Sequence, residues 1–108
     1  MHENFIDFSE ENIDQELARM DKIILVDFWN ESCVTCKRLV PVLEGLASKF
    51  KDKLVFASVN VDRNPEIVKR FEVKGLPTLL LIKAGRVLEK ITGLHTRSEL
   101  IELIEKNF

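Results

Sequence analysis

Apolar residues along this chain form short continuous runs and, between them, stripes with helical spacing. The runs are rich in β-branched and aromatic residues, which is typical of strands covered on both faces of a sheet. Gly85 lies in the short connection between the last two strand-like segments, so a hairpin of antiparallel strands is predicted there. The pattern predicts five strands, at residues 4–8, 22–29, 54–61, 76–82 and 87–92.

Helices are predicted between these strands and at the end of the chain. Ser9, followed by two glutamates, is a favourable helix start, and Asn64 with Pro65 provides a cap and a proline at the first helical position. Thr96 and Glu99 form a capping box. Four helices are therefore predicted, at residues 9–20, 34–50, 65–71 and 97–108. The order βαβαβαββα predicts an α/β fold with a central mixed five-stranded sheet flanked by four helices.

Composition adds bounds on size, surface and location. A chain of 108 residues that is 45% hydrophobic fits one domain, residues 1–108, which can bury a core without a disulfide. The 16 basic and 18 acidic residues are interspersed and give a formal net charge of -2, so neither a nucleic-acid surface nor a membrane surface is indicated. Residues 1–14 lack the features of a signal peptide, and no apolar segment approaches the length of a membrane span. We therefore expect a cytoplasmic protein.

The candidate chemistry lies in the stretch WNESCVTCK, which contains both cysteines, Cys33 and Cys36, and the only tryptophan. A reducing compartment disfavours a structural disulfide, which leaves metal binding or redox exchange. Structural zinc needs about four ligands, and the chain adds only His2 and His95, at spacings unlike the common zinc patterns. We therefore expect no metal site. The pair lies where the second strand ends and the second helix begins. Open α/β folds place their sites there, beyond the carboxyl ends of the parallel strands.

The position of Cys33 favours redox exchange on physical grounds. A residue at a helix N-cap faces the unpaired N–H groups of the first turn and the positive end of the helix dipole. These groups stabilise a thiolate, so we expect a lowered pKa for Cys33 and a more buried, less ionised Cys36. Cys33 would attack a substrate disulfide, and Cys36 would then attack Cys33, which releases the substrate and leaves an intramolecular disulfide.

Six segments of the sequence fit one known pattern: Val26–Trp29, Cys33–Lys37, Pro41, Asn64–Pro65, Gly75–Thr78 and Gly93. In these segments, and over essentially its whole length, the chain resembles the thioredoxin family. The resemblance implies the thioredoxin fold. The chain departs from the usual family pattern at three places. Its motif reads Cys-Val-Thr-Cys where Cys-Gly-Pro-Cys is typical, Ser32 replaces a tryptophan, and Ser58 replaces a lysine.

Asp27 interrupts the most apolar run of the chain. Burial there is expected to raise its pKa, which would let the carboxyl group exchange protons near neutral pH. The resemblance assigns Asp27 to proton transfer at Cys36. The structural alternative is an aspartate at a strand end that reaches solvent or caps a backbone N–H, and we favour proton transfer because perturbed groups are enriched near reactive sites.

The resemblance also implies a substrate-binding face around the cysteines. It implies a cis peptide bond between Leu76 and Pro77, which would offer the backbone of Leu76 to an extended peptide. Trp29 is expected to shield one side of the active loop, and Gly93 to line the substrate groove through its lack of a side chain. The remaining residues expected to touch a substrate or a reductase are Ser32, Val34 and Thr35.

The resemblance implies a thiol-disulfide oxidoreductase that reduces protein disulfides. Its expected partners are disulfide-containing proteins and a flavin- or ferredoxin-linked thioredoxin reductase, and we expect a monomer without a cofactor of its own. Two alternatives stay open. One is a thioredoxin-like electron carrier dedicated to one enzyme system, and the other is a thioredoxin-fold binding module that docks partners through the face around Pro77.

Overall fold

The structure, a computed structural model, describes residues 4–108, so His2 lies outside the described residues. Its elements follow the predicted order βαβαβαββα. The strands are β1 (Ile6–Asp7), β2 (Ile23–Trp29), β3 (Leu54–Asn60), β4 (Thr78–Lys83) and β5 (Arg86–Thr92). The helices are α1 (Ile13–Arg19), α2 (Val34–Lys49), α3 (Pro65–Arg70) and α4 (Arg97–Glu105).

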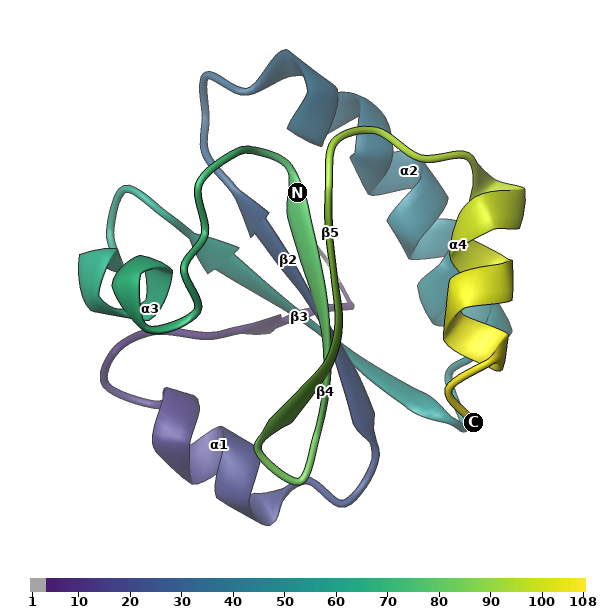
Figure 1. Cartoon of the computed structure of the whole chain (residues 1–108), viewed down its shortest axis with the longest axis horizontal. Helices are drawn as coiled ribbons and strands as arrows, with labels where there is room; N and C mark the ends of the chain where they lie inside the picture. Colours follow the sequence, from purple (N-terminus) through teal and green to yellow (C-terminus); the bar gives the residue numbers. More distant parts are fainter. Residues whose placement is uncertain (1–3) are drawn as a thin grey trace.

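The five strands form one mixed sheet in the order β1-β3-β2-β4-β5. β1 and β2 run parallel to β3, whereas β4 is antiparallel to both β2 and β5. Figure 1 shows the twisted sheet between two layers of helix, with α2 and α4 on one face and α1 and α3 on the other. This arrangement confirms the predicted α/β fold. No helix within residues 4–108 combines the length and the apolar character needed to span a bilayer.

Each face of the sheet has its own hydrophobic core because side chains alternate across the pleat. In β2, Ile23 and Leu25 pack with the residues of α2 and α4, whereas Ile24, Val26 and Phe28 pack with those of α1 and α3. The central strands read as nearly continuous apolar runs since both of their faces are covered. Burial on both faces fixes the position of β2, which leads directly into the cysteine loop.

The N-terminal segment differs from the prediction. β1 spans two residues, and α1 begins at Ile13 instead of Ser9. The Asn12 side chain accepts a hydrogen bond from the Ser9 backbone N–H (2.9 Å) and donates one to the Asp7 carbonyl (2.9 Å). Local bonding of this kind offers the backbone an alternative to the helix. The segment 9–12 is therefore a turn, and the helix starts after it.

Asn64 precedes α3, but its side chain makes no capping bond to that helix, which corrects the predicted cap. Its side chain accepts from the Glu10 backbone N–H (3.0 Å) and donates to the Asn60 carbonyl (2.9 Å). The Glu10 carboxylate instead accepts from the Glu66 N–H in the first turn of α3 (2.6 Å). A residue far away in sequence thus supplies the cap, and the turn before α1 is tied to α3.

The two C-terminal connections follow the predicted chemistry. β4 and β5 are joined by Ala84 and Gly85, which both have positive φ (52° and 77°), as in a type I′ hairpin turn. α4 begins with the predicted capping box. The Thr96 side chain accepts from the Glu99 N–H at 3.1 Å, and the Glu99 side chain accepts from the Thr96 N–H at 2.8 Å.

Candidate active site

Three loops that flank three of the strands meet at one end of the sheet. Phe28 of β2 lies opposite Thr78 of β4, and Thr78 lies opposite Thr92 of β5. Because β4 runs antiparallel to both of its neighbours, the chain leaves β2 and β5 at this end of the sheet and enters β4 there. The β2–α2, α3–β4 and β5–α4 loops therefore lie at the same end of the sheet, the upper end in Figure 1. Apart from Asp27 and Trp29 of β2, every predicted site residue lies in these loops or in the first turn of α2.

Cys33 is the N-cap residue of α2, as predicted. Its sulfur accepts a hydrogen bond from the Cys36 backbone N–H at 3.1 Å and lies 3.4 Å from the Thr35 hydroxyl. The Cys33 backbone N–H donates to the Asn30 carbonyl across the loop (3.4 Å), and the Cys33 side chain is partly exposed. Two polar hydrogens and the N-terminal end of a 16-residue helix thus face one accessible sulfur, an environment that favours a thiolate.

Cys36 lies one turn into α2 and is 0% exposed. It is joined to Cys33 by a disulfide, with the two Cα atoms 5.2 Å apart, a separation that disulfides commonly bridge. Cys33 is a partly exposed residue, whereas Cys36 is enclosed. This asymmetry suits an exchange in which the two sulfurs act in turn.

Asp27 is 0% exposed and lies in the middle of the sheet, which confirms its predicted burial. It is flanked along β2 by Val26 and Phe28, and it lies opposite Leu79 on β4 and Ser58 on β3. Ser58 is also buried, so a small neutral side chain occupies the position where the family usually has lysine. An apolar, enclosed position of this kind disfavours the charged form of a carboxyl group.

The peptide bond between Leu76 and Pro77 is cis, as the resemblance implied. Pro77 is buried, whereas Leu76 is partly exposed. The Gly93 N–H donates to the Pro77 carbonyl at 2.8 Å, and Gly93 has a φ of +96°, which a side chain would strain. A hydrogen bond therefore connects the β5–α4 loop to the cis-proline loop at the end of the sheet where the cysteines lie.

The residues around the cysteines differ in exposure. Val34 is 62% exposed, and Ser32 is exposed with its hydroxyl 3.3 Å from the Asn30 side-chain oxygen. Trp29, the last residue of β2, is partly buried. Leu94, which the sequence reasoning did not select, is 52% exposed in the β5–α4 loop. The sequence did offer a signal for it, since Leu94 is an apolar residue directly after a glycine predicted to line the site. Together with Val34, it adds apolar surface at this end of the sheet.

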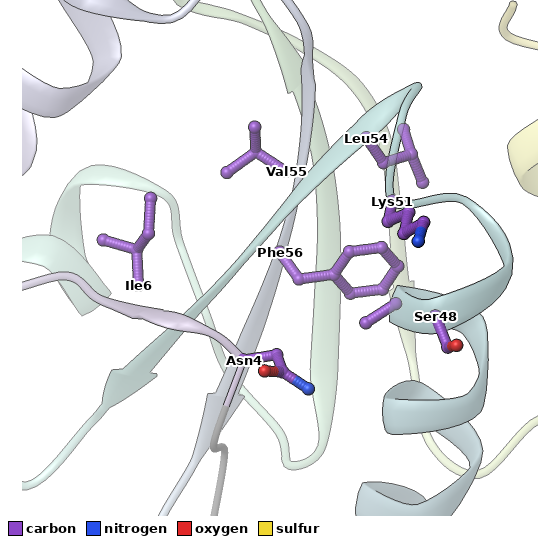
Figure 2. A pocket seen from close by; sticks show the side chains of 8 residues that line it. Asn4, Ile6, Ser48, Lys51, Leu54, Val55 and Phe56 are labelled. Atoms are coloured by element: carbon purple, nitrogen blue, oxygen red, sulfur yellow. The ribbon is translucent and has the colours of Figure 1, made fainter.

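The hollow in Figure 2 and the cysteines lie at opposite ends of the sheet, measured along the strands. It forms where β3 begins and α2 ends, whereas the cysteine pair lies where β2 ends and α2 begins. Within residues 4–108 there is no group of three or more His, Cys, Asp or Glu side chains that could hold a metal ion. Residues lining the hollow include Ile6, Ser48, Lys51, Leu54, Val55 and Phe56.

Comparison with known proteins agrees with the fold and the cysteine geometry. The family model described as Thioredoxin matches residues 4–106. A thioredoxin from Chlorobaculum thiosulfatiphilum is 33% identical over 103 residues, which cover 95% of each chain. A thioredoxin from Alicyclobacillus acidocaldarius subsp. acidocaldarius is 40% identical over 86 residues, 80% of this chain and 82% of the relative. A thioredoxin from Pseudomonas aeruginosa is 32% identical over 107 residues, 99% of each chain.

A mixed five-stranded sheet, a cysteine pair at the start of α2 and a cis-proline before β4 define the class of proteins that exchange dithiols and disulfides. Within that class this chain belongs to the thioredoxin family, and it is a thiol-disulfide oxidoreductase. Thioredoxins act on disulfide substrates and are reduced by a thioredoxin reductase.

Proposed function

We propose that this protein reduces protein disulfides with Cys33 as the nucleophile and Cys36 as the resolving thiol. The observation that carries the proposal is the position of Cys33, a partly exposed residue at the N-cap of α2 whose sulfur is bonded to the buried Cys36. The accessible sulfur is the one that a bulky substrate can reach. The enclosed sulfur is close enough to complete the exchange within one protein molecule.

The exchange proceeds in two steps that move two electrons to the substrate. The Cys33 thiolate attacks one sulfur of the substrate disulfide, the substrate S–S bond breaks, and the leaving sulfur takes up a proton. A mixed disulfide now joins Cys33 to the substrate. Cys36 loses its proton and attacks the Cys33 sulfur, which releases the second substrate sulfur as a thiolate that then takes up a proton. The substrate holds two thiols, and the protein holds the Cys33–Cys36 disulfide.

Asp27 is the group that accepts the Cys36 proton in the second step. Its complete burial supports this role, because an enclosed carboxyl group is uncharged more easily than an exposed one and can exchange protons near neutral pH. Ser58, which lies opposite Asp27 in the strand pair, is neutral, whereas the family usually has a lysine at this position.

The substrate binds across the surface formed by the cysteine loop and the cis-proline loop. The backbone of Leu76 pairs with an extended substrate segment, since the cis bond to Pro77 turns the chain at this point. Gly93 leaves room beside it. The side chains that contact the substrate around Cys33 are Trp29, Ser32, Val34 and Thr35.

We also propose a reductase type, an oligomeric state and a cellular location, all suggested by the resemblance to thioredoxins. A flavin- or ferredoxin-linked thioredoxin reductase returns two electrons to the Cys33–Cys36 disulfide, and no further cofactor is needed because the two sulfurs carry the electrons themselves. Residues 1–108 act as one thioredoxin domain, a monomer in the cytoplasm. The match of the family model to residues 4–106 supports the single domain.

Trapping tests the proposed roles of the two sulfurs. Cys36→Ser can form the mixed disulfide but cannot resolve it, so partners should accumulate on Cys33 and be released by dithiothreitol. The matched control is the double variant Cys33→Ser, Cys36→Ser, which should trap nothing. Trapping by Cys33→Ser but not by Cys36→Ser would reverse the two roles, and equal trapping by both would show that the two sulfurs are equivalent.

The same experiment separates a general reductase from a dedicated carrier. The departures at Ser32, Val34 and Thr35 alter the surface that partners touch, which is why the dedicated carrier is tested as the alternative. Many trapped proteins indicate a general reductase, whereas one dominant partner indicates a dedicated carrier. Insulin reduction driven by dithiothreitol adds a direct assay: activity that disappears in Cys33→Ser supports the reductase, and an inactive wild type favours a binding module.

A further inference from the structure

A chain of hydroxyl groups connects the cis-proline loop to β5, and no step of the exchange uses it. Thr78 is 0% exposed, and its hydroxyl donates to the Gly75 carbonyl at 2.5 Å. The Thr92 hydroxyl lies 3.3 Å from the Thr78 hydroxyl oxygen. A hydroxyl has one hydrogen, and that of Thr78 is committed to Gly75. The Thr92 hydroxyl is therefore the donor to Thr78.

These bonds lie where the ladder between β4 and β5 weakens. An antiparallel pair of this kind ordinarily makes two backbone hydrogen bonds, but Pro77 has no N–H, so it shares with Gly93 only the bond from the Gly93 N–H (2.8 Å). Thr78 and Thr92 are the next pair of the ladder, and side chains of directly opposite residues lie close enough to interact. Their hydroxyls add a connection beside the bond that proline removes.

The methyl group of Thr92 also lies close to Gly75. A Cβ atom built on Gly75 would lie 3.1 Å from Thr92 Cγ2, which shows how closely the end of β5 approaches this backbone. Thr92 thus approaches this part of the chain at two points, with its methyl group near Gly75 and with its hydroxyl at Thr78, the first residue of β4. Both contacts fix the segment that leads into Leu76 and Pro77.

We propose that Thr78 and Thr92 are positioning residues that hold the backbone of Leu76 in the geometry that pairs with an extended substrate. The inference rests on the proposed function, in which the Leu76 backbone binds the substrate. The hydroxyls act through the Gly75 carbonyl, one residue before Leu76, and not on the reacting sulfurs. A protein disulfide should therefore depend on them, whereas a small disulfide that does not pair with the backbone should not.

Thr92→Val and Thr92→Ser separate the hydroxyl from the methyl group. Valine keeps both γ-carbons and suits a strand, so this variant should fold, and serine keeps the hydroxyl alone. Second-order rate constants are measured for the fully reduced proteins with insulin and with Ellman's reagent, a small aromatic disulfide. Thr92→Val should slow insulin reduction about threefold, the effect of losing one modest neutral hydrogen bond, and leave the rate with Ellman's reagent unchanged. Thr92→Ser keeps the hydroxyl bond and loses only the methyl group, so it should reduce insulin faster than Thr92→Val.

Thr78→Val and Thr78→Ser provide a second pair. Thr78→Val should slow insulin reduction by about tenfold, because the partly buried Gly75 carbonyl loses its donor, and Thr78→Ser should restore the rate. An unchanged insulin rate in Thr92→Val, an equal loss with both disulfides, or a serine variant as slow as the valine variant would each overturn the positioning role. A wild type that reduces Ellman's reagent but not insulin would instead overturn the proposed function, and the positioning role with it.

Discussion

At the scale of single residues, the Thr35 hydroxyl is the group that most distinguishes this active site. It lies 3.4 Å from the Cys33 sulfur, at the position where the usual motif has proline, which offers neither a hydroxyl nor an N–H. A hydrogen bond to a charged group is worth about 1.5–3 kcal/mol, so this donor favours the thiolate. A stabilised thiolate stabilises the reduced dithiol and makes the disulfide more oxidising.

Thr35→Val should therefore raise the pKa of Cys33 and make the reduction potential more negative. Valine keeps the shape of threonine and its backbone N–H, so the change isolates the hydroxyl. Thr35→Pro should shift both quantities in the same direction and further, and Thr35→Ser should leave them close to the wild type. Thiol alkylation against pH and a redox titration with glutathione measure the two quantities. A potential that moves the other way would show that the hydroxyl does not act on the thiolate.

Asp27→Asn should leave the attack by Cys33 intact and slow the resolution of the mixed disulfide. Cys36 would lose its proton acceptor, and general base catalysis of this kind contributes on the order of 100-fold or more. The free energy of unfolding should rise, because an amide is less costly to bury than a carboxylate. Single-turnover release of substrate from the mixed disulfide near pH 7 measures the effect. An unchanged release rate would make Asp27 a structural residue only.

The residues of the site differ in how far the sequence could predict them. Residue type, spacing and the junction of strand and helix together indicated Cys33 and Cys36, and the apolar run around Asp27 indicated its burial. The contact between Thr78 and Thr92 could not be predicted in this way. It joins residues 14 positions apart, and it exists because of the register of β4 against β5, which a hydrophobic pattern does not specify to the residue.

At the scale of elements, the hairpin turn between β4 and β5 contains a residue in an unfavourable conformation. Ala84 has a φ of 52°, in the left-handed region that favours glycine and asparagine. Ala84→Asn should raise the free energy of unfolding by about 0.5–1 kcal/mol, part of the cost of the left-handed conformation for an ordinary residue. Urea denaturation measures the change. Ala84→Val serves as the opposite control and should destabilise, and an asparagine variant less stable than the wild type would contradict the argument.

The capping box of α4 predicts a pH dependence of stability. Hydrogen bonds from the Thr96 backbone N–H and side chain lower the pKa of Glu99, with a smaller contribution from His95. A carboxyl group whose pKa is lower in the folded state stabilises the fold above its unfolded pKa, about 4.3, and this stabilisation is lost as the pH falls through the folded value. Glu99→Gln keeps an acceptor but has no charge to lose.

The free energy of unfolding should therefore be lower in Glu99→Gln than in the wild type at pH 6, and the difference should shrink as the pH falls below about 4. Urea titrations at a series of pH values measure it. Glu102→Gln, on the same helix but beyond its first turn, provides the matched control. A difference that is constant from pH 6 to low pH would show that the charge of Glu99 has no part in the cap.

The order of elements followed from the hydrophobic pattern, but the first helix start did not. Ser9 and Glu10 carry the signals of a helix start, yet the Glu10 carboxylate caps α3 at Glu66, 56 residues later in the chain, and α1 begins at Ile13. A capping residue in a sequence predicts that a helix end lies nearby in space. It does not predict which helix, because the pairing of α3 with the turn before α1 arises only in the folded chain.

At the scale of the whole molecule, two cores on opposite faces of one sheet hold the site, and the thiols contribute little to them. Of the two cysteines, only Cys36 belongs to the buried set, and the central strands β2 and β3 contribute to both cores. The disulfide joins residues three positions apart, so it closes a very short loop. The chain-entropy model gives about 2 kcal/mol for a loop of this size, against about 5–15 kcal/mol for a typical domain.

Cys33→Ser and Cys36→Ser should therefore both fold and unfold cooperatively, with losses of no more than about 2 kcal/mol relative to the oxidised wild type. Addition of EDTA should leave the melting temperature unchanged, whereas a domain built on structural zinc would unfold when its metal is removed. Thermal denaturation followed by circular dichroism, with and without EDTA, measures both effects on matched samples. Loss of a cooperative transition in either serine variant would show that the thiols are needed to hold the sheet and helices together, and a transition sensitive to EDTA would show the same of a bound metal.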